Sequence, residues 1–85
     1  ITLYQNYPNP FNPSTQISFA LPKSEHVQLS VFNVSGQMIV ELINDQMPAG
    51  VHQVTFDAQG LSSGTYIYQL KTSDGVLNKK LLLIK

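Results

Sequence analysis

Cysteine and tryptophan are absent from this sequence, and the lack of cysteine limits both how the chain is stabilised and what it can bind. A chain of 85 residues forms one small domain, and no disulfide can supplement its core. Zinc needs three or four ligands, which two separated histidines do not supply. The aspartates stand singly in different turns and match no calcium loop. We therefore expect no metal site and no cofactor.

An excess of charge of either sign is also missing. Five lysines balance five acidic residues, which argues against a nucleic-acid partner because binding to phosphates depends on positive charge. The positive charge is nevertheless unevenly placed, since Lys79, Lys80 and Lys85 all fall in the last seven positions. We expect a basic C-terminal end.

Long apolar runs are absent as well, and none approaches the roughly 18 residues that predict a membrane-spanning helix. We therefore expect no transmembrane segment. The sequence begins at Ile1, without a methionine or the pattern of a signal peptide. We expect residues 1–85 to be a single domain cut from a longer multidomain protein whose cargo or catalytic part lies upstream.

What the sequence does contain is a period of two in its apolar residues, which is typical of strands with one buried face. The pattern is clearest at residues 16–21, where Ile17, Phe19 and Leu21 share a face, and at residues 65–72. Strands are expected at residues 2–4, 16–21, 27–34, 37–43, 52–57, 65–72 and 76–85, with the first of them short. The segment 37–43 is apolar on both faces, which predicts burial or a β-bulge.

Turn-forming residues separate these segments. Turns or loops are expected at residues 22–25, 35–36, 44–50, 58–64 and 73–75. Ser35-Gly36 supplies a residue free to take a positive φ, and Asp74-Gly75 is a typical hairpin signal. Short strands at about ten-residue spacing without helical periodicity predict an all-β fold. We expect an immunoglobulin-like antiparallel β-sandwich of six or seven strands.

Proline is concentrated near the start of the chain, in residues 7–15 (YPNPFNPST). Three of the five prolines fall within six residues there, so this segment can be neither a helix nor a central strand. We expect a stiff, extended lead-in. Tyr7 and Phe11 are predicted to pack onto the edge of the sandwich while the prolines protect that edge against stray pairing.

The sequence contains no recognisable catalytic motif. A nucleophile needs a nearby base and oxyanion donors, and no Gly-x-Ser-x-Gly motif is present. His52 shares a strand face with Val54 and Phe56, so we expect a partly buried histidine bonded to a backbone carbonyl. His26, beside Glu25 at a strand start, is expected to be a solvated edge residue. We expect no enzyme and no catalytic residues.

Five segments in the same order carry a resemblance to a known family. They are residues 7–15, 31–37, 49–58, 61–70 and 80–85. With them, the chain resembles the type A C-terminal sorting domains of the type IX (Por) secretion system, over nearly its whole length. Each segment is weak alone, but five in order are specific. The resemblance implies an immunoglobulin-like fold and a secretion signal that directs an upstream cargo across the outer membrane.

The resemblance also implies partners and a location. Such domains end proteins of Gram-negative bacteria that enter the periplasm and then reach the cell surface or the medium. The implied partners are an outer-membrane translocon and a sortase-like peptidase that removes the domain, with a cleavage site before or near Ile1. The expected recognition residues are Lys79, Lys80, Leu82, Ile84, Lys85, Gly64 and Tyr66. We expect the translocon to pair with the exposed edge of the last strand and to contact its lysines.

An alternative function is an immunoglobulin-like accessory or spacer module that binds polysaccharide or a cell surface. Tyr66 and Tyr68 could form a stacking platform for sugars if both rings were exposed. Leu70 shares their strand face, however, so an inward orientation is favoured.

Overall fold

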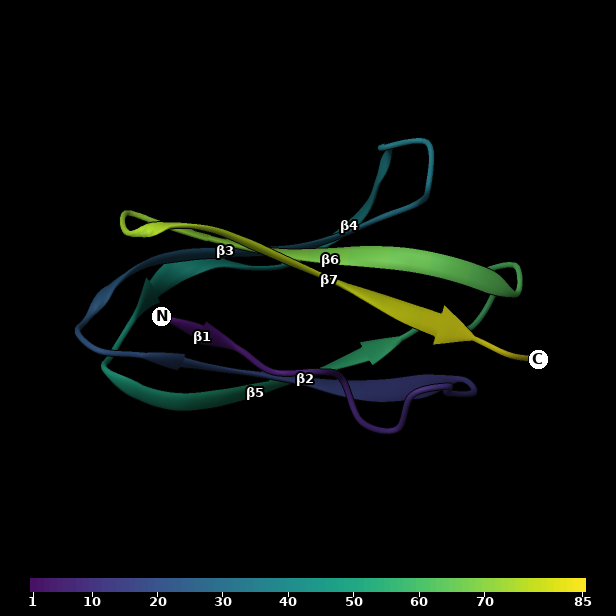
Figure 1. The fold of residues 1–85 in the computed structure, drawn as a ribbon, viewed down its shortest axis with the longest axis horizontal. Coiled ribbons are helices and arrows are strands. Elements are labelled where there is room, and N and C mark those ends of the chain that lie inside the picture. The colour runs from purple at the N-terminus through teal and green to yellow at the C-terminus, as the bar shows by residue number, and fades with distance from the viewer.

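The computed structural model describes residues 1–85, and in it seven strands form two antiparallel sheets that pack face to face (Figure 1). The strands are β1 Thr2–Leu3, β2 Ser14–Leu21, β3 Glu25–Phe32, β4 Met38–Met47, β5 Gly50–Asp57, β6 Gly64–Thr72 and β7 Gly75–Leu83. One sheet has the order β1-β2-β5 and the other the order β4-β3-β6-β7. The predicted all-β, immunoglobulin-like sandwich is therefore confirmed.

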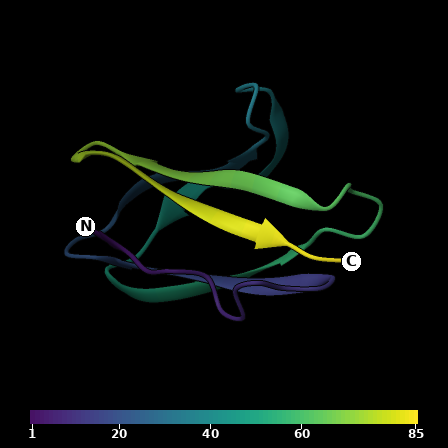
Figure 2. The ribbon, with the colours of Figure 1, turned by 45° about the vertical axis from the view of Figure 1, so that its right-hand side comes forward.

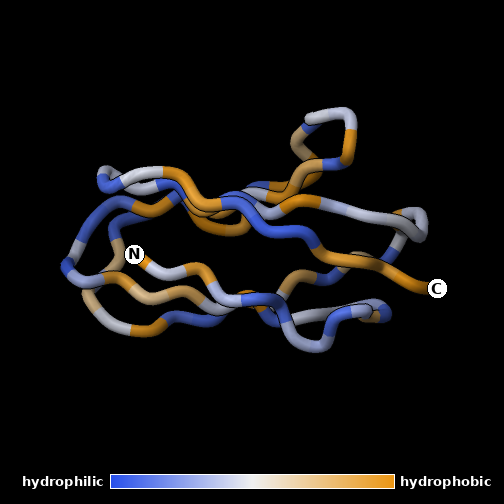
Figure 3. The backbone as a smooth tube through the Cα atoms, in the orientation of Figure 1, coloured by the Kyte–Doolittle hydropathy of each residue, from blue (hydrophilic) through white to orange (hydrophobic).

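The core lies between the two sheets and is built from the alternating apolar residues of each strand. The largest fully buried apolar side chains are Tyr68, Phe19, Ile17, Leu29, Leu70, Leu81, Leu83, Val27 and Val31. The expected inward faces of β2, β3 and β6 are thus confirmed. Figure 3 shows hydrophobic stretches on both layers, and it shows β7 passing from a hydrophilic to a hydrophobic stretch before the C-terminus.

Two β-bulges explain why β4 is apolar on both faces. The pairing between β3 and β4 changes register twice, so Ile39 and Leu42 have no direct partner on β3. Each extra residue reverses the alternation of side chains along the strand. As a result all four aliphatic residues of β4 become half-buried. Of the two alternatives that the sequence left open, burial or a β-bulge, the structure shows bulges together with half-burial.

The connection expected over residues 44–50 is wrong, because β4 continues to Met47 and only Pro48 and Ala49 separate it from β5. Residues 44–47 pair with residues 25–28 of β3 although their side chains are mostly polar. An edge strand tolerates polar residues because one side of it faces water. The hydrophobic pattern therefore ends before the strand does.

The start of β3 also differs from the expectation. The sequence predicts a turn at Glu25, but this residue is the first of β3 and is 5% exposed. Its Oε1 atom accepts a hydrogen bond from the Ser73 hydroxyl (3.0 Å). His26 is exposed as expected, although β3 is an interior strand of its sheet and not an edge. His52 was expected to be partly buried and bonded to a backbone carbonyl, and this is confirmed. Its ring is half-buried, its centroid lies 5.4 Å from that of Phe19, and its Nε2 lies 2.7 Å from the carbonyl oxygen of Pro48.

Tyr68 ties the N-terminal segment to the core. Its ring is fully buried, and its hydroxyl donates to the carbonyl oxygen of Tyr4 (2.7 Å) while accepting from the backbone N–H of Asn6 (2.9 Å). Burial raises the pKa of this hydroxyl above its ordinary value of 10.0, and the Asn6 hydrogen bond opposes the shift less strongly. The neutral phenol is the form that the folded protein holds.

Replacing Tyr68 with phenylalanine is expected to lower the free energy of unfolding by about 1–3 kcal/mol, because a buried N–H and a carbonyl lose their partner. Urea denaturation at pH 8 measures this loss.

The raised pKa of Tyr68 in the folded state means that the wild-type domain loses stability as pH rises above 10.0, because the unfolded tyrosine ionises first. Urea denaturation of the wild type and of Tyr68→Phe at increasing pH measures this loss. The variant should lose less stability than the wild type over the alkaline range, and equal losses would contradict this assignment.

Candidate functional site

The last strand, β7, turns its side chains alternately into and away from the core. Leu81 and Leu83 are each 1% exposed and anchor the strand between the sheets. Leu82 and Ile84 lie on the other side and are 38% and 51% exposed. Lys80 is exposed on that same side, because residues two apart in a strand point the same way. Three of the predicted recognition residues therefore share the outer face of the larger sheet.

The other lysines of this end differ in their surroundings. Lys79 is half-buried and pairs in register with Tyr68, so its side chain lies on the core side of the strand and not beside Lys80. Lys85 is exposed at the chain end, and its backbone N–H donates to the Ser63 hydroxyl (3.1 Å). The one ion pair of the domain joins Lys23 to Asp74 (3.6 Å), at the opposite end of β7. The three C-terminal lysines thus have no carboxylate partner within the domain.

Gly64 and Tyr66 lie on β6, beside the last residues of β7. Gly64 pairs in register with Leu83. Its φ is 146°, a value that residues with a side chain rarely adopt. Tyr66 is only 8% exposed, and its hydroxyl donates to the carbonyl oxygen of Ser62 (2.7 Å). Its side chain therefore faces the core, where it supports β7 from within. Because Tyr68 is also fully buried, the two rings form no platform for sugars.

The N-terminal segment occupies the outer edge of β7. The backbone N–H of Phe11 donates to the carbonyl oxygen of Leu82, and the N–H of Ile84 donates to the carbonyl oxygen of Phe11 (both 3.0 Å). Two side chains complete this contact: Asn9 Oδ1 accepts from the N–H of Leu82 (2.9 Å), and the Gln5 amide donates to the carbonyl oxygen of Lys80 (2.8 Å). We call Gln5, Asn9 and Phe11 the N-terminal clamp. Figure 2 shows the N-terminal segment (purple) on the lower layer, with β7 (yellow) above it.

The clamp contradicts the expectation that the edge of the last strand is free to pair with the translocon. An incoming strand cannot pair with the edge of β7 from Lys80 to Ile84 while those backbone groups are bonded to the clamp. Pairing of a partner with the last residues, as the sequence suggested, would require the clamp to leave. The side chains of β7, by contrast, remain accessible on its outer face.

The aromatic residues of the proline-rich segment behave differently from one another. Phe11 is 2% exposed, and its ring centroid lies 6.0 Å from that of Phe56, as the sequence predicted for a residue that packs on the sandwich. The same prediction for Tyr7 is wrong, since Tyr7 is 82% exposed. Its backbone pairs with Gln16, which directs the ring outward.

Sequence reasoning missed the polar residues that shape this segment. Asn6 is 2% exposed, and its side-chain amide donates to Thr15 Oγ1 (3.0 Å) and to the carbonyl oxygen of Pro8 (3.2 Å). The Thr15 hydroxyl donates to the same carbonyl oxygen (2.8 Å). Asparagines interleaved with prolines were the available signal, because short amides commonly bond to nearby backbone.

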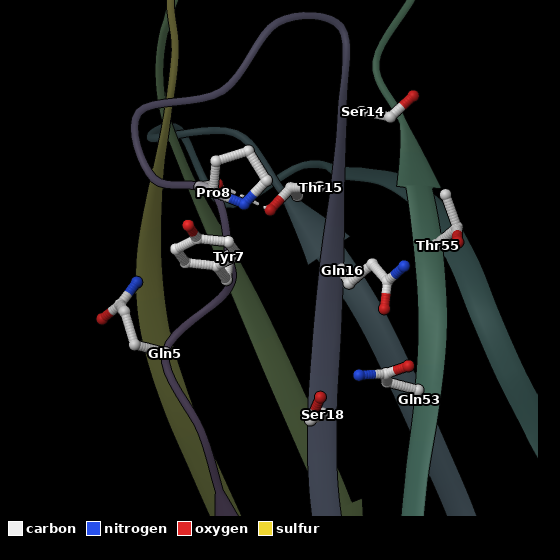
Figure 4. Close-up of a pocket in the computed structure, with 9 residues that line it drawn as sticks. All are labelled: Gln5, Tyr7, Pro8, Ser14, Thr15, Gln16, Ser18, Gln53 and Thr55. Atoms are coloured by element: carbon white, nitrogen blue, oxygen red, sulfur yellow. Dashed lines mark hydrogen bonds between the residues drawn. The ribbon is translucent and has the colours of Figure 1, made fainter.

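The largest surface groove lies elsewhere, on the outer face of the smaller sheet. Figure 4 shows it between the N-terminal segment, β2 and β5. Its volume is about 460 Å³, and it is lined by Gln5, Tyr7, Pro8, Ser14, Thr15, Gln16, Ser18, Gln53 and Thr55. No carboxylate, imidazole or amine lies among them. No three His, Asp or Glu side chains of the domain gather closely enough to hold a metal ion. The structure contains no helix with the length and apolarity needed to cross a membrane.

Comparison with known families gives a match over almost the whole chain. The family model described as "Secretion system C-terminal sorting domain" matches residues 5–85, which include both the clamp and β7. Searches of curated proteins and of solved structures gave no match. This family is not a family of enzymes, and the match does not favour an accessory polysaccharide-binding module. Its domains engage the secretion system and direct proteins to the outer membrane or cell surface. The chain therefore belongs to the C-terminal sorting domains of the type IX secretion system.

Proposed function

We propose that the outer-membrane translocon of the type IX system recognises this domain through the C-terminal end of β7. The contacts would come from Lys80, Leu82, Ile84 and Lys85, with Lys79 contributing from the core side of the strand. Gly64 and Tyr66 take part by holding β7 in place, since Gly64 pairs with Leu83 and the Tyr66 side chain is buried. The proposal depends on one observation: buried leucines alternate with exposed apolar and basic residues along the last strand.

The charge at this end supports a protein partner with carboxylates. The C-terminal lysines have no acidic neighbour in the domain, so their charge is available to a partner. Complementary charge speeds encounter and discriminates against wrong partners, and apolar contacts at Leu82 and Ile84 would add affinity.

The route of the cargo follows from this role. The domain would form the C-terminal part of a longer protein of a Gram-negative bacterium. That protein would pass through the periplasm with the domain attached. A sortase-like peptidase would then remove the domain by cutting before or near Ile1. The first strand begins at Thr2 and Leu3 is buried in the core, so a cut before Ile1 would leave every strand of the sandwich in place.

Reversing the charge of Lys80 tests the recognition site. In a type IX-competent cell, a reporter fused to the domain with Lys80→Glu should be exported about tenfold or more slowly, because like charges would meet at the interface. The reporter should accumulate in the periplasm, uncut. Lys23→Glu is the matched control, since Lys23 is equally a surface lysine but lies at the far end of the domain.

Both variants should remain folded, because Lys80 has no ion pair and the exposed Lys23–Asp74 pair contributes only about 1 kcal/mol or less to the free energy of unfolding. Thermal denaturation of the two purified domains verifies this. Equal export of the Lys80→Glu and Lys23→Glu fusions would refute the proposed recognition site.

A further inference from the structure

A row of paired residues crosses all four strands of the larger sheet on its outer face. Met38 of β4 pairs with Phe32 of β3, Phe32 pairs with Ile67 of β6, and Ile67 pairs with Lys80 of β7. Directly paired residues of neighbouring antiparallel strands project to the same side of a sheet. The row therefore ends at one of the residues proposed above for recognition.

The row is more apolar than a solvent-facing surface requires. Met38 is 54% exposed, and Val34, in the turn that follows β3, is 73% exposed. Phe32 and Ile67 are half-buried and, with Val34, line a groove of about 300 Å³. Leu82 and Ile84 extend the apolar surface beyond Lys80. Contiguous exposed apolar residues rimmed by polar ones commonly mark an interaction site.

We infer that Met38, Val34, Phe32 and Ile67 form a second half of the docking surface, continuous with Lys80, Leu82 and Ile84. The occupant is a protein of the secretion machinery that presents an apolar ridge to the groove and carboxylates to the lysines. This inference rests on the proposed function, and it moves the centre of the interface from the chain end to the middle of the larger sheet.

The charges on this face favour an acidic partner protein over a second copy of the domain or an anionic membrane. Lys71 and Lys80 lie on this face, whereas Glu41, which pairs with Ser30, is the acidic residue of β4 on the same side. A second copy of the domain would bring a further excess of lysine into the interface. An anionic membrane would bring Glu41 against headgroups of the same charge. A partner protein with acidic residues satisfies both the apolar and the basic groups.

The test uses Met38→Glu and Val34→Glu, which alter exposed side chains and leave the core intact. Val51→Glu is the matched control, because Val51 is 70% exposed on the smaller sheet. We expect export of a fused reporter to fall at least fivefold for the first two variants and to stay unchanged for the control. Combining Met38→Glu with Lys80→Glu should lower export less than the product of the two single effects, since both act on one interface.

The outcomes separate this inference from the proposed function. If Lys80→Glu blocks export but Met38→Glu and Val34→Glu do not, the extended surface is wrong while the recognition of β7 stands. If none of the three changes export, both are wrong. Sedimentation showing dimers that Met38→Glu dissociates would assign the face to a second copy. Binding to phosphatidylglycerol vesicles that Met38→Glu abolishes would assign it to a membrane. Either result would overturn a protein partner from the secretion machinery.

Discussion

Replacing Phe11 with alanine should lower the free energy of unfolding by about 3–5 kcal/mol, the usual cost of removing a buried phenylalanine. Phe11 is 2% exposed and packs against Phe56, although it lies outside every strand. Its loss would leave a cavity where the proline-rich segment meets the sandwich. For a domain of this size the melting temperature should fall by more than about 10 °C. Thermal and urea denaturation of the purified variant measure the change.

The neighbouring Tyr7 provides the control for Phe11. Tyr7 belongs to the same motif and is also aromatic, but it is 82% exposed. Tyr7→Ala should change the free energy of unfolding by about 0.5 kcal/mol or less, because its backbone pairing with Gln16 is kept. Hydrogen exchange adds a second readout: the amides of Leu82 and Ile84 should exchange faster in Phe11→Ala. Similar stabilities of the two variants would show that the segment is not anchored through Phe11.

Deleting residues 81–85 should unfold the domain. The deletion removes Leu81 and Leu83, each 1% exposed, and the loss of each buried leucine costs about 2–5 kcal/mol. It also removes the backbone that pairs with both β6 and the clamp. A small domain has a total stability of about 5–15 kcal/mol, so little would remain. Far-ultraviolet circular dichroism of the purified domain should show loss of the β signal at 25 °C.

A shorter deletion separates folding from recognition. Removing only Ile84 and Lys85 takes away exposed side chains and two backbone hydrogen bonds, those to Phe11 and Ser63. This variant should remain folded, with a loss of about 1–3 kcal/mol. Its fused reporter should nevertheless be poorly exported if the chain end is recognised. For the longer deletion, a cooperative melt would mean that residues 81–83 of β7 are dispensable for the fold.

Local alternation of apolar residues was enough to predict most strands. β2, β3 and β6 each bury one face, so their residues repeat with a period of two, and the structure buries the expected side chains. For β4 the apolar pattern on both faces left two alternatives, burial or a β-bulge, and the structure shows two changes of register. The turns at Gly36 and Gly75 followed from the residues themselves, and both glycines have positive φ.

Contacts between residues distant in sequence could not be predicted in this way. The clamp joins Asn9 to Leu82 through one side-chain oxygen, and no local pattern specifies that partner. Burial of Glu25 depends on Ser73, which approaches it only in the folded sandwich. The inward orientation of Tyr66 followed from the period of two and is confirmed by its burial. The recognition residues came from the family resemblance, and the sequence could not show that Phe32 and Ile67 lie beside Lys80.

The direction of the clamp has a mechanical consequence. Phe11 pairs with Leu83 in parallel orientation, so the chain runs the same way on both sides of the contact. A cargo on the N-terminal side and a receptor holding the last strand would pull these two segments in opposite directions along their length. The hydrogen bonds of Lys80, Leu82 and Ile84 to the clamp would then be loaded in shear and would have to break together, instead of opening one by one. Such an arrangement would keep the domain closed if its N-terminal and C-terminal ends were pulled apart.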